Sequence, residues 1–202
     1  MSDAVTAAYD TRSAEYVEIL GSVDQMADED RRTITAWRDR VSGPIVDAGC
    51  GPGHWTDLLA KGGDPRVVGL DASAAMLASA RDRFSRITCA RADLGHLPFA
   101  DGSVGGVLAW YSVIHAEAAE LPRILGEVAR VLRPGGSLLL GFFDGPAGAP
   151  FDHAVARARW WSVTALTELM APHGLVLERS ASRQDPGVRR HGEIVAIREP
   201  VA

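Results

Sequence analysis

Glycine and acidic residues stand at the ends of three short aliphatic runs in this sequence. The first run ends in Asp47 and continues as "AGCGPGHW", in which Gly49 and Gly51 lie two positions apart. Asp71 ends the run "VVGLD", and Asp93 follows "RITCA". Glycine lacks the Cβ atom that would keep a ligand away from the backbone, and a carboxylate accepts hydrogen bonds from hydroxyl and amino groups. This combination predicts a site for a ligand derived from a nucleotide.

The loop departs from the signature of dinucleotide-binding proteins. That signature, G-x-G-x-x-G, needs a third small residue for close helix packing, but the sixth position counted from Gly49 is His54. A diphosphate also needs an uncrowded helix N-terminus, whereas Pro52, His54 and Trp55 fill this turn. NAD is therefore disfavoured, although Asp71 alone is compatible with it.

S-adenosylmethionine agrees better with these residues, because it carries an ammonium and a sulfonium and no phosphate. We expect Asp47 to face the ammonium directly or through water, and Asp71 to accept hydrogen bonds from both ribose hydroxyls. Asp93 is placed to accept a hydrogen bond from the adenine amino group, while the Leu94 amide donates one to a ring nitrogen. Gly49 and Gly51 let the chain pass under the cofactor.

The elements that position these residues alternate in type along the chain. Short Val-, Ile- and Leu-rich runs predict strands, and segments of helical period between them predict crossover helices, which together indicate an α/β fold with a parallel sheet. The predicted strands cover 44–47, 66–71, 86–90, 103–110 and 137–143, and two further strands at 175–183 and 193–199 form a tail able to pair antiparallel. The predicted helices cover 27–41, 54–61, 72–84 (with Ser73 as N-cap), 121–132 and 163–171.

Composition narrows the functional class. The net charge is -5 and Lys and Arg form no long block, which disfavours a nucleic-acid partner. The apolar runs are too short to cross a bilayer, and Cys50 and Cys89 suggest neither a disulfide framework nor a metal site. We expect a cytoplasmic protein with one domain over 1–202, in which a helical cap at 1–43 precedes a catalytic sheet domain at 44–202.

The motifs "VDAGCGPG", "VVGLDAS", "RADLGHLPF", "VLAWYSVIH" and "VARVLRPGGSLLL" resemble those of class I S-adenosylmethionine-dependent methyltransferases. The resemblance covers about 45–140 and is strongest to the small ubiquinone and menaquinone biosynthesis C-methyltransferases. It implies a Rossmann-like seven-stranded sheet of order 3-2-1-4-5-7-6 with the last strand antiparallel, and S-adenosylhomocysteine as a product. The implied cofactor-binding residues are Asp47, Gly49, Gly51, Trp55, Asp71, Ala72, Met76, Asp93, Leu94 and Trp110.

Methyl transfer from a sulfonium needs alignment and exclusion of water, and it needs a base only for weak nucleophiles. The rim after the fourth strand carries Tyr111, Ser112 and His115, and His115 has a pKa range suited to accepting a proton. The catalytic candidates are His115, Tyr111 and His153; cofactor contact or helix capping by His115 and a surface position for His153 are the alternatives.

The remaining acceptor residues are expected in two flanking segments. The Gly- and Pro-rich stretch after the fifth strand, with Asp144, His153 and Trp160, predicts a loop that closes over the acceptor. Tyr9 and Tyr16 are expected to form the opposite wall. A small, partly aromatic acceptor would then contact an aromatic set consisting of Trp110, Tyr111, Phe142, Phe143 and Trp160.

Three functions remain open on the residues alone. A methyltransferase acting on a small molecule, as a monomer or homodimer, is favoured over an NAD-dependent oxidoreductase and over a non-catalytic module that binds S-adenosylmethionine. A nucleic-acid amino-methylating enzyme would carry Asn or Asp before "PP" and an aromatic residue where this chain has "WYSV". The atom that accepts the methyl group, whether carbon, nitrogen or oxygen, stays undetermined.

Overall fold

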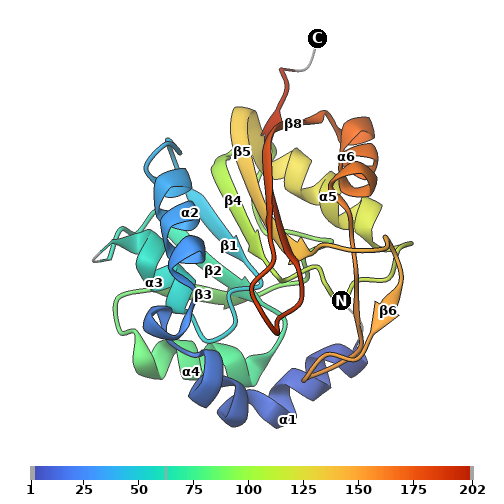
Figure 1. The fold of residues 1–202 in the computed structure, drawn as a ribbon. Coiled ribbons are helices and arrows are strands. Elements are labelled where there is room, and N and C mark those ends of the chain that lie inside the picture. Colours follow the sequence, from blue (N-terminus) through green and yellow to red (C-terminus); the bar gives the residue numbers. More distant parts are fainter. Residues whose placement is uncertain (1–2, 62, 201–202) are drawn as a thin grey trace.

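A seven-stranded sheet forms the centre of the computed structural model, which describes residues 3–61 and 63–200 (Figure 1). Its order is β3-β2-β1-β4-β5-β9-β8, and β9 runs antiparallel to both neighbours. The strands are β1 (Ile45–Ala48), β2 (Val67–Asp71), β3 (Thr88–Arg91), β4 (Val104–Trp110), β5 (Leu132–Phe143), β8 (Leu175–Arg183) and β9 (His191–Arg198). The predicted fold class and strand order are confirmed. The first and last two residues of the predicted domain lie outside the described residues.

The central strands are buried on both faces, which explains their continuous apolar runs. Every residue of β1 and β4 is buried, as expected where helices cover both faces of a parallel sheet. β5 begins earlier than the predicted start at Ser137. Leu132 already pairs with Val104, and the register then shifts so that Ser137 pairs with Gly106. The strand therefore includes the turn that follows the preceding helix, and its pairing with β4 is irregular at that turn.

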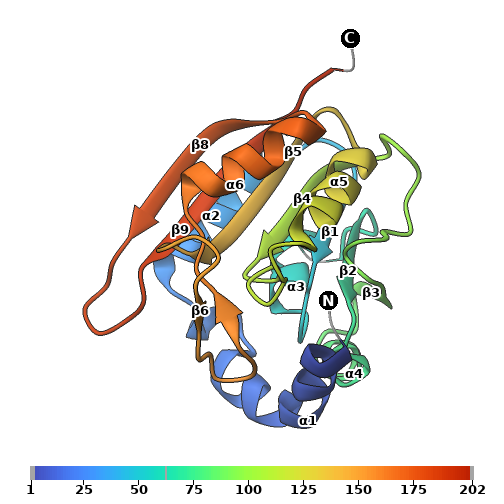
Figure 2. The same ribbon diagram turned by 90° about the vertical axis from the view of Figure 1, so that its right-hand side faces the viewer.

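Helices cover the two faces of the sheet (Figures 1 and 2). On one face lie α2 (Asp28–Arg38) and α3 (His54–Ala60), where Ile34 and Trp37 of α2 pack against Trp55 and Leu59 of α3. Beyond the end of α2, Val41 still packs against this cluster, as its predicted position on the same helix face requires.

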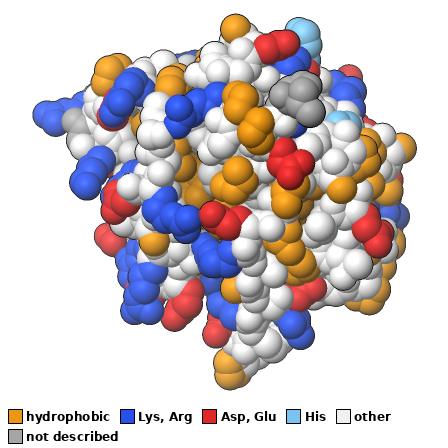
Figure 3. Space-filling model, turned by 90° about the horizontal axis from the view of Figure 1, so that it is seen from above, with side chains coloured by type: hydrophobic (Ala, Val, Ile, Leu, Met, Phe, Trp, Pro, Cys, Tyr) orange, Lys and Arg blue, Asp and Glu red, His pale blue; other side chains and the backbone are white. Residues whose placement is uncertain are grey.

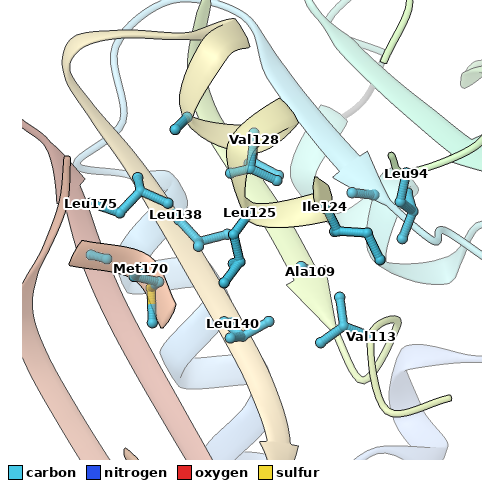
Figure 4. Packing of buried hydrophobic residues seen from close by; sticks show 14 of the residues in the cluster. Leu94, Ala109, Val113, Ile124, Leu125, Val128, Leu138, Leu140, Met170 and Leu175 are labelled. Carbon is cyan, nitrogen blue, oxygen red and sulfur yellow. The ribbon is translucent and has the colours of Figure 1, made fainter. Parts of the chain in front are cut away.

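On the other face lie α5 (Leu121–Val131) and α6 (Val163–Met170), followed by the short 3-10 helix η2 (Ala171–His173). Figure 4 shows that Leu125 lies between α5 and the sheet, close to Leu138 and Leu140 of β5. These side chains are at most 1% exposed, so truncating one to Ala is expected to cost about 2–5 kcal/mol. This packing fixes β4 and β5, and with them the site at their carboxyl ends.

The N-terminal segment crosses the carboxyl ends of the strands beside α4 (Ala74–Arg83) (Figure 1). It consists of α1 (Asp3–Leu20) and the short 3-10 helix η1 (Val23–Gln25). Ser73 caps α4 as predicted, because its Oγ accepts a hydrogen bond from the Met76 amide.

The Gly- and Pro-rich stretch after β5 contains a small unpredicted hairpin of β6 (Pro150–Phe151) and β7 (Ala158–Arg159). Among the described residues, no helix is long and apolar enough to span a membrane.

Candidate functional site

A cavity of about 450 Å³ lies at the carboxyl ends of β1, β2 and β4. It is enclosed by α1 on one side and by the β8–β9 hairpin on the other. Its glycine-loop half is formed by Gly49, Cys50, Gly51, Pro52, His54, Trp55, Asp71, Ala72, Met76, Ala92 and Leu94. Its histidine half is formed by Tyr9, Asp30, Tyr111, Ser112, His115, Phe143, His153, Arg183, Asp185 and His191. Trp110 lies between the two halves.

Asp71 connects the glycine loop to the start of α4. Its Oδ2 accepts a hydrogen bond of 2.9 Å from the Gly51 amide, and its Oδ1 accepts one of 2.8 Å from the Ser73 amide. Burial raises the pKa of this carboxyl group, and the backbone hydrogen bonds oppose that rise. Each oxygen retains acceptor capacity toward the cavity. The residue therefore has the position expected of a group that binds two hydroxyls.

The two loop glycines are required for different reasons. Gly51 has a φ of +51° and a Cβ atom built on it would have no neighbour within 4 Å. Gly49 has a φ of +85°, and its Cβ would lie 2.2 Å from the Cβ of Ser112. Gly49 thus allows the loop to approach the end of β4, whereas Gly51 leaves the cavity open; the predicted passage of the chain under a ligand stays a prediction.

Two predicted carboxylates lie outside the cavity lining. Asp47 is 1% exposed and accepts a hydrogen bond of 2.6 Å from the Thr56 hydroxyl, and its burial raises its pKa to about 7. Asp93 accepts hydrogen bonds of 3.2 Å from the guanidinium of Arg123 and lies largely at the surface. The predicted contacts of these two side chains with a cofactor stay predictions. The remaining predicted cofactor-binding residues all line the cavity.

Buried polar atoms without hydrogen-bond partners gather around the cavity. They are Nδ1 and Nε2 of His54, Nε1 of Trp110, Oγ of Ser112 and Nε of Arg183. Burial lowers the pKa of His54 to about 4, which keeps this ring neutral. Unsatisfied buried polar groups are costly, so these atoms indicate that a ligand supplies their partners. In the sequence, His54 is distinguished only because it stands where the dinucleotide signature has its third glycine. Its position in the cavity lining was not predicted.

His115 is held in one tautomer by hydrogen bonds to two other segments. Its Nδ1 lies 2.9 Å from the carbonyl oxygen of Arg157, which can only accept, so Nδ1 carries the hydrogen. Nε2 therefore carries the lone pair and accepts a hydrogen bond of 2.9 Å from the Tyr9 hydroxyl. Burial lowers the pKa of His115, and that of the neighbouring His153 ring to about 4. The arrangement is that of a neutral imidazole able to accept a proton.

Tyr111 lines the same half of the cavity and has a strained backbone conformation. Its φ is +56°, which is rare for a residue with a side chain. Its hydroxyl is hydrogen-bonded to Nδ1 of His191, and its ring packs against Phe143 with centroids 5.0 Å apart. Burial raises the pKa of the phenol, which keeps it protonated.

The aromatic set predicted for the acceptor is only partly correct. Phe143 lines the cavity, but the adjacent Phe142 is fully buried in the core, because successive side chains of a strand point to opposite faces. Trp160 lies outside the lining and packs on Phe151 with ring centroids 4.7 Å apart. Asp144 is engaged by Arg190 and the Ser182 hydroxyl and also lies outside the lining.

An ion pair in the cavity wall has no counterpart among the predicted residues. Nη1 of Arg183 in β8 donates a hydrogen bond of 2.6 Å to Oδ1 of Asp30 in α2, and the Asp30 side chain is 9% exposed. The two residues are 153 positions apart in the sequence. Nothing local in either segment marks the pairing, since it depends on how the β8–β9 hairpin folds over α2.

The helix α1 is fastened across the opening of the cavity. Asp10 accepts hydrogen bonds of 2.6 Å from the Ser73 hydroxyl and 3.1 Å from the Ala75 amide, at the N-terminus of α4. Tyr9 and Tyr16, which face the cavity from this helix, form the wall that was predicted for them. Burial raises the pKa of Tyr16 to about 12.

A second, more open hollow of about 610 Å³ lies near the amino ends of β4 and β5. Its rim carries Arg32, Arg40, Arg133 and Arg179. Acidic side chains alternate with basic ones on this end of the molecule (Figure 3), and Glu178 and Glu193 pair with Arg40 and Arg179. The described residues contain no cluster of His, Cys, Asp or Glu arranged to hold a metal ion.

Residues 45–136 match the model of the family described as methyltransferase domain. The chain is 34% identical over 122 residues to a demethylmenaquinone methyltransferase of Beutenbergia cavernae, a match that covers 60% of this chain and 50% of that protein. It spans about half or less of the length of the curated relatives it matches.

Solved structures match nearly the whole chain at low identity. The [4+2]-cyclase SpnF has a TM-score of 0.80 at 19% identity, with 98% of this chain and 96% of that chain covered. A Burkholderia thailandensis 1,6-didemethyltoxoflavin-N1-methyltransferase crystallised with S-adenosylhomocysteine has a TM-score of 0.72 at 18% identity, with 99% and 92% covered. These likenesses show the fold. Together with the family match, they confirm the resemblance to class I S-adenosylmethionine-dependent methyltransferases.

Proposed function

We propose that this protein is an enzyme that binds S-adenosylmethionine in the glycine-loop half of the cavity and transfers a methyl group to a small molecule in the histidine half. The observation that carries the proposal is the continuity of the cavity. The cavity connects two sites. One is a carboxylate and a glycine loop suited to bind an adenosine, and the other is an imidazole whose surroundings fix the lone pair on Nε2. The names of the relatives, which include a demethylmenaquinone methyltransferase, a trans-aconitate 2-methyltransferase and a malonyl-[acyl-carrier protein] O-methyltransferase, agree with it.

The residues present agree with a cofactor that has no phosphate. Among the described residues that line the cavity, Arg183 is the one Lys or Arg, and it lies in the histidine half. A diphosphate would therefore find no basic side chain beside the glycine loop. A ribose and an amino-acid group can instead hydrogen-bond to Asp71 and to the unpartnered atoms of His54, Trp110 and Ser112.

The side chains expected to bind the cofactor have separate proposed tasks. Asp71 binds the ribose hydroxyls, and Met76 and Leu94 contact the adenine ring. Trp110 and Trp55 enclose the methionyl part. We keep the two carboxylates outside the lining as proposed contacts, with Asp47 acting through water and Asp93 acting on the adenine amino group after its pairing with Arg123 opens. When bound, S-adenosylmethionine supplies a methyl group on a positively charged sulfur and leaves as S-adenosylhomocysteine.

The histidine half aligns the acceptor and takes its proton. His115 is neutral, and Nε2 is the ring nitrogen that can accept. A proton reaches Nε2 directly when the acceptor displaces the Tyr9 hydroxyl, or through that hydroxyl, which accepts one proton as it donates its own. Tyr111 orients the acceptor, and His153 supports it from the loop. Because α1 closes the cavity, water is excluded. This favours methyl transfer to the aligned acceptor over hydrolysis of the cofactor.

Isothermal titration with S-adenosylmethionine tests the first half of this proposal. We expect micromolar binding, and much weaker binding by Asp71→Ala, while Asp64→Ala, at a half-buried site outside the cavity lining, leaves it unchanged. Incubation with methyl-labelled cofactor and a metabolite extract tests the second half, and label should appear in a small molecule. Absence of heat at millimolar cofactor, or binding of NADH instead, would overturn the assignment. Tight cofactor binding without any labelled product would indicate a non-catalytic binding module.

The assembly and surroundings of the enzyme are part of the same proposal. We infer one domain, in which 1–43 cap the sheet domain 44–202, acting as a monomer or homodimer in the cytoplasm. The free thiols of Cys50 and Cys89 support a reducing compartment. Light scattering after size-exclusion chromatography measures the oligomeric state, and limited proteolysis should leave the cap attached to the sheet.

A further inference from the structure

The histidine half has one cation, and that cation is already neutralised. Arg183 donates to Asp30 at 2.6 Å, and its Nε, which is buried and makes no hydrogen bond with the described residues, lies 3.5 Å from Oδ2 of Asp185, whose side chain is 58% exposed. The Asp30 carboxylate is almost completely buried, so water does not replace Arg183 as its partner. A negatively charged acceptor entering this half would lose its hydration without gaining a free positive charge from the wall.

The imidazole and phenol groups that face this half are neutral. The imidazoles of His115, His153 and His191 all have pKa values lowered by burial, and the phenols of Tyr9 and Tyr111 have pKa values raised by it. Arginines near the loop lie outside the lining: Arg189 stacks on Phe151 and donates to the Asp152 carbonyl, and Arg12 pairs with Glu15. The half therefore holds one guanidinium and two carboxylates among its described residues, and it offers a negatively charged ligand no net positive charge.

The base and the ring wall restrict the acceptor further. A general base accelerates transfer only when the acceptor has a proton to lose, which a carboxylate lacks. The Phe143 ring lies at the centre of an aromatic wall, with centroid distances of 5.0 Å to Tyr111, 5.5 Å to His191 and 6.0 Å to His153. Such rings stack well against a flat acceptor.

We infer that the acceptor is an uncharged, flat aromatic molecule with a hydroxyl or ring N–H group, and that Asp30 sets this preference by neutralising Arg183. The inference rests on the proposed function for the transfer step itself. In that step the acceptor gives its proton to Nε2 of His115, and its oxygen or nitrogen lone pair forms the bond to the methyl carbon. The electron pair of the broken carbon–sulfur bond stays on sulfur.

Two probes with the same ring system test this inference without turnover. Titration calorimetry at pH 7.5 compares 2-naphthol, which is neutral, with 2-naphthoate, which is anionic, in the presence and absence of S-adenosylhomocysteine. We expect 2-naphthol to bind at least about tenfold more tightly, a difference of about 1.4 kcal/mol. Equal or tighter binding of 2-naphthoate would overturn the charge preference, and no binding of either probe at millimolar concentration would overturn the aromatic class.

Substitution of the neutralising carboxylate should reverse the preference. In Asp30→Asn the guanidinium of Arg183 is left without its buried counter-charge, so the affinity ratio should move at least about tenfold toward 2-naphthoate. Asp24→Asn is the matched control, because this exposed carboxylate contacts Arg31 outside the cavity, and it should leave the ratio unchanged. An unchanged ratio in folded Asp30→Asn would refute the role of Asp30.

A second variant keeps the test decisive if Asp30→Asn does not fold, as judged by its thermal transition. Arg183→Gln removes the cation instead, and it should retain the preference for 2-naphthol and weaken 2-naphthoate further. A gain of 2-naphthoate affinity in this variant would contradict the inference. Titration of S-adenosylhomocysteine alone separates the two proposals. Its failure to bind, with discrimination between the probes intact, contradicts the proposed function and leaves the cavity's charge preference standing.

Discussion

The two halves of the cavity are built in different ways. The glycine-loop half is drawn from 49–94, a continuous stretch in which each contributing residue follows a strand or begins a helix. The histidine half takes its residues from α1, α2, the end of β4, the loop after β5 and the β8–β9 hairpin. The first half depends on local backbone geometry, whereas the second depends on how distant segments pack.

This difference separates the part of the cavity that lies within the family match from the part that lies mostly outside it. The family match over 45–136 includes the entire glycine-loop half, and within the histidine half it reaches only the residues that follow β4. A cofactor site can remain constant while the segments around it change, since loops and terminal helices tolerate variation better than the sheet does. Variants in the two halves should therefore have separable effects, on cofactor affinity in one half and on turnover in the other.

The largest effect is expected from His115→Ala. Loss of a general base typically lowers turnover by about 10²–10⁴-fold, whereas cofactor affinity should stay within about threefold. The measurement is the rate of methyl-label transfer beside titration with S-adenosylhomocysteine. His96→Ala, at an exposed position, is the control. Equal loss of rate and affinity would mean that His115 belongs to the cofactor site, and the separation of the halves would fail.

The same residue predicts the pH dependence of the rate. Only neutral His115 accepts a proton, and burial lowers its pKa below the ordinary value of 6.5. The rate should therefore be constant from pH 8 down to about 6.5 and should fall only at lower pH, as the imidazole becomes protonated. A fall that begins above pH 7 would contradict a buried, neutral base.

The complementary variant is Asp71→Ala. Each hydrogen bond to a charged group contributes about 1.5–3 kcal/mol, so loss of the bonds to the Gly51 and Ser73 amides and to a ribose should weaken S-adenosylhomocysteine by about a hundredfold or more. Binding of 2-naphthol should change little, because the histidine half is assembled from other segments. Parallel titrations of both ligands measure the split. Loss of both affinities would show that the halves fold as one unit.

The contrast also explains how far the sequence predicts the molecule. The α/β class and the cavity positions of Gly51 and Asp71 follow from local signals, namely glycine conformation and a carboxylate after a strand, whereas the strand order and the position of Met76 were implied by the family resemblance. His115 and Tyr9 were predicted separately, but their hydrogen bond joins residues 106 positions apart. Asp30 was missed for the same reason, since a buried acid in a charged helix looks like a solvated one until its partner is known.

A smaller effect is expected where α1 is attached. Asp10→Ala removes the hydrogen bonds from the Ser73 hydroxyl and the Ala75 amide, a loss similar to that of a helix cap, about 1 kcal/mol. Dissociation of S-adenosylhomocysteine should accelerate about fivefold, and the α1 amides should exchange hydrogen faster. Asp82→Ala, at an exposed position of α4, is the control. Unchanged exchange would mean that α1 is held mainly by Tyr9 and Tyr16.

The smallest effect concerns Asp47, a member of the glycine motif that lies outside the lining. Its pKa is raised from 3.8 to about 7 by burial, so the folded protein holds a proton that the unfolded chain loses near pH 4. The protonated form therefore contributes stability below pH 4, and this contribution is lost progressively between pH 4 and 7. Asp47→Asn has no such proton, and its Tm relative to the original protein should rise across that interval.

This rise in Tm, taken together with the cofactor affinity of Asp47→Asn, shows what Asp47 does. About 1 kcal/mol corresponds to roughly 2–4 °C in a domain of this size, and melting curves at pH 5 and pH 8 with Asp82→Asn as control resolve that difference. A rise with unchanged cofactor affinity means that Asp47 supports the loop through Thr56 only. A rise with weaker affinity means that its negative charge acts on the ammonium through water. A difference in Tm that is the same at both pH values would show that the carboxyl group of Asp47 does not hold an extra proton in the folded state. Stability depends on pH only where the folded and unfolded states bind protons differently.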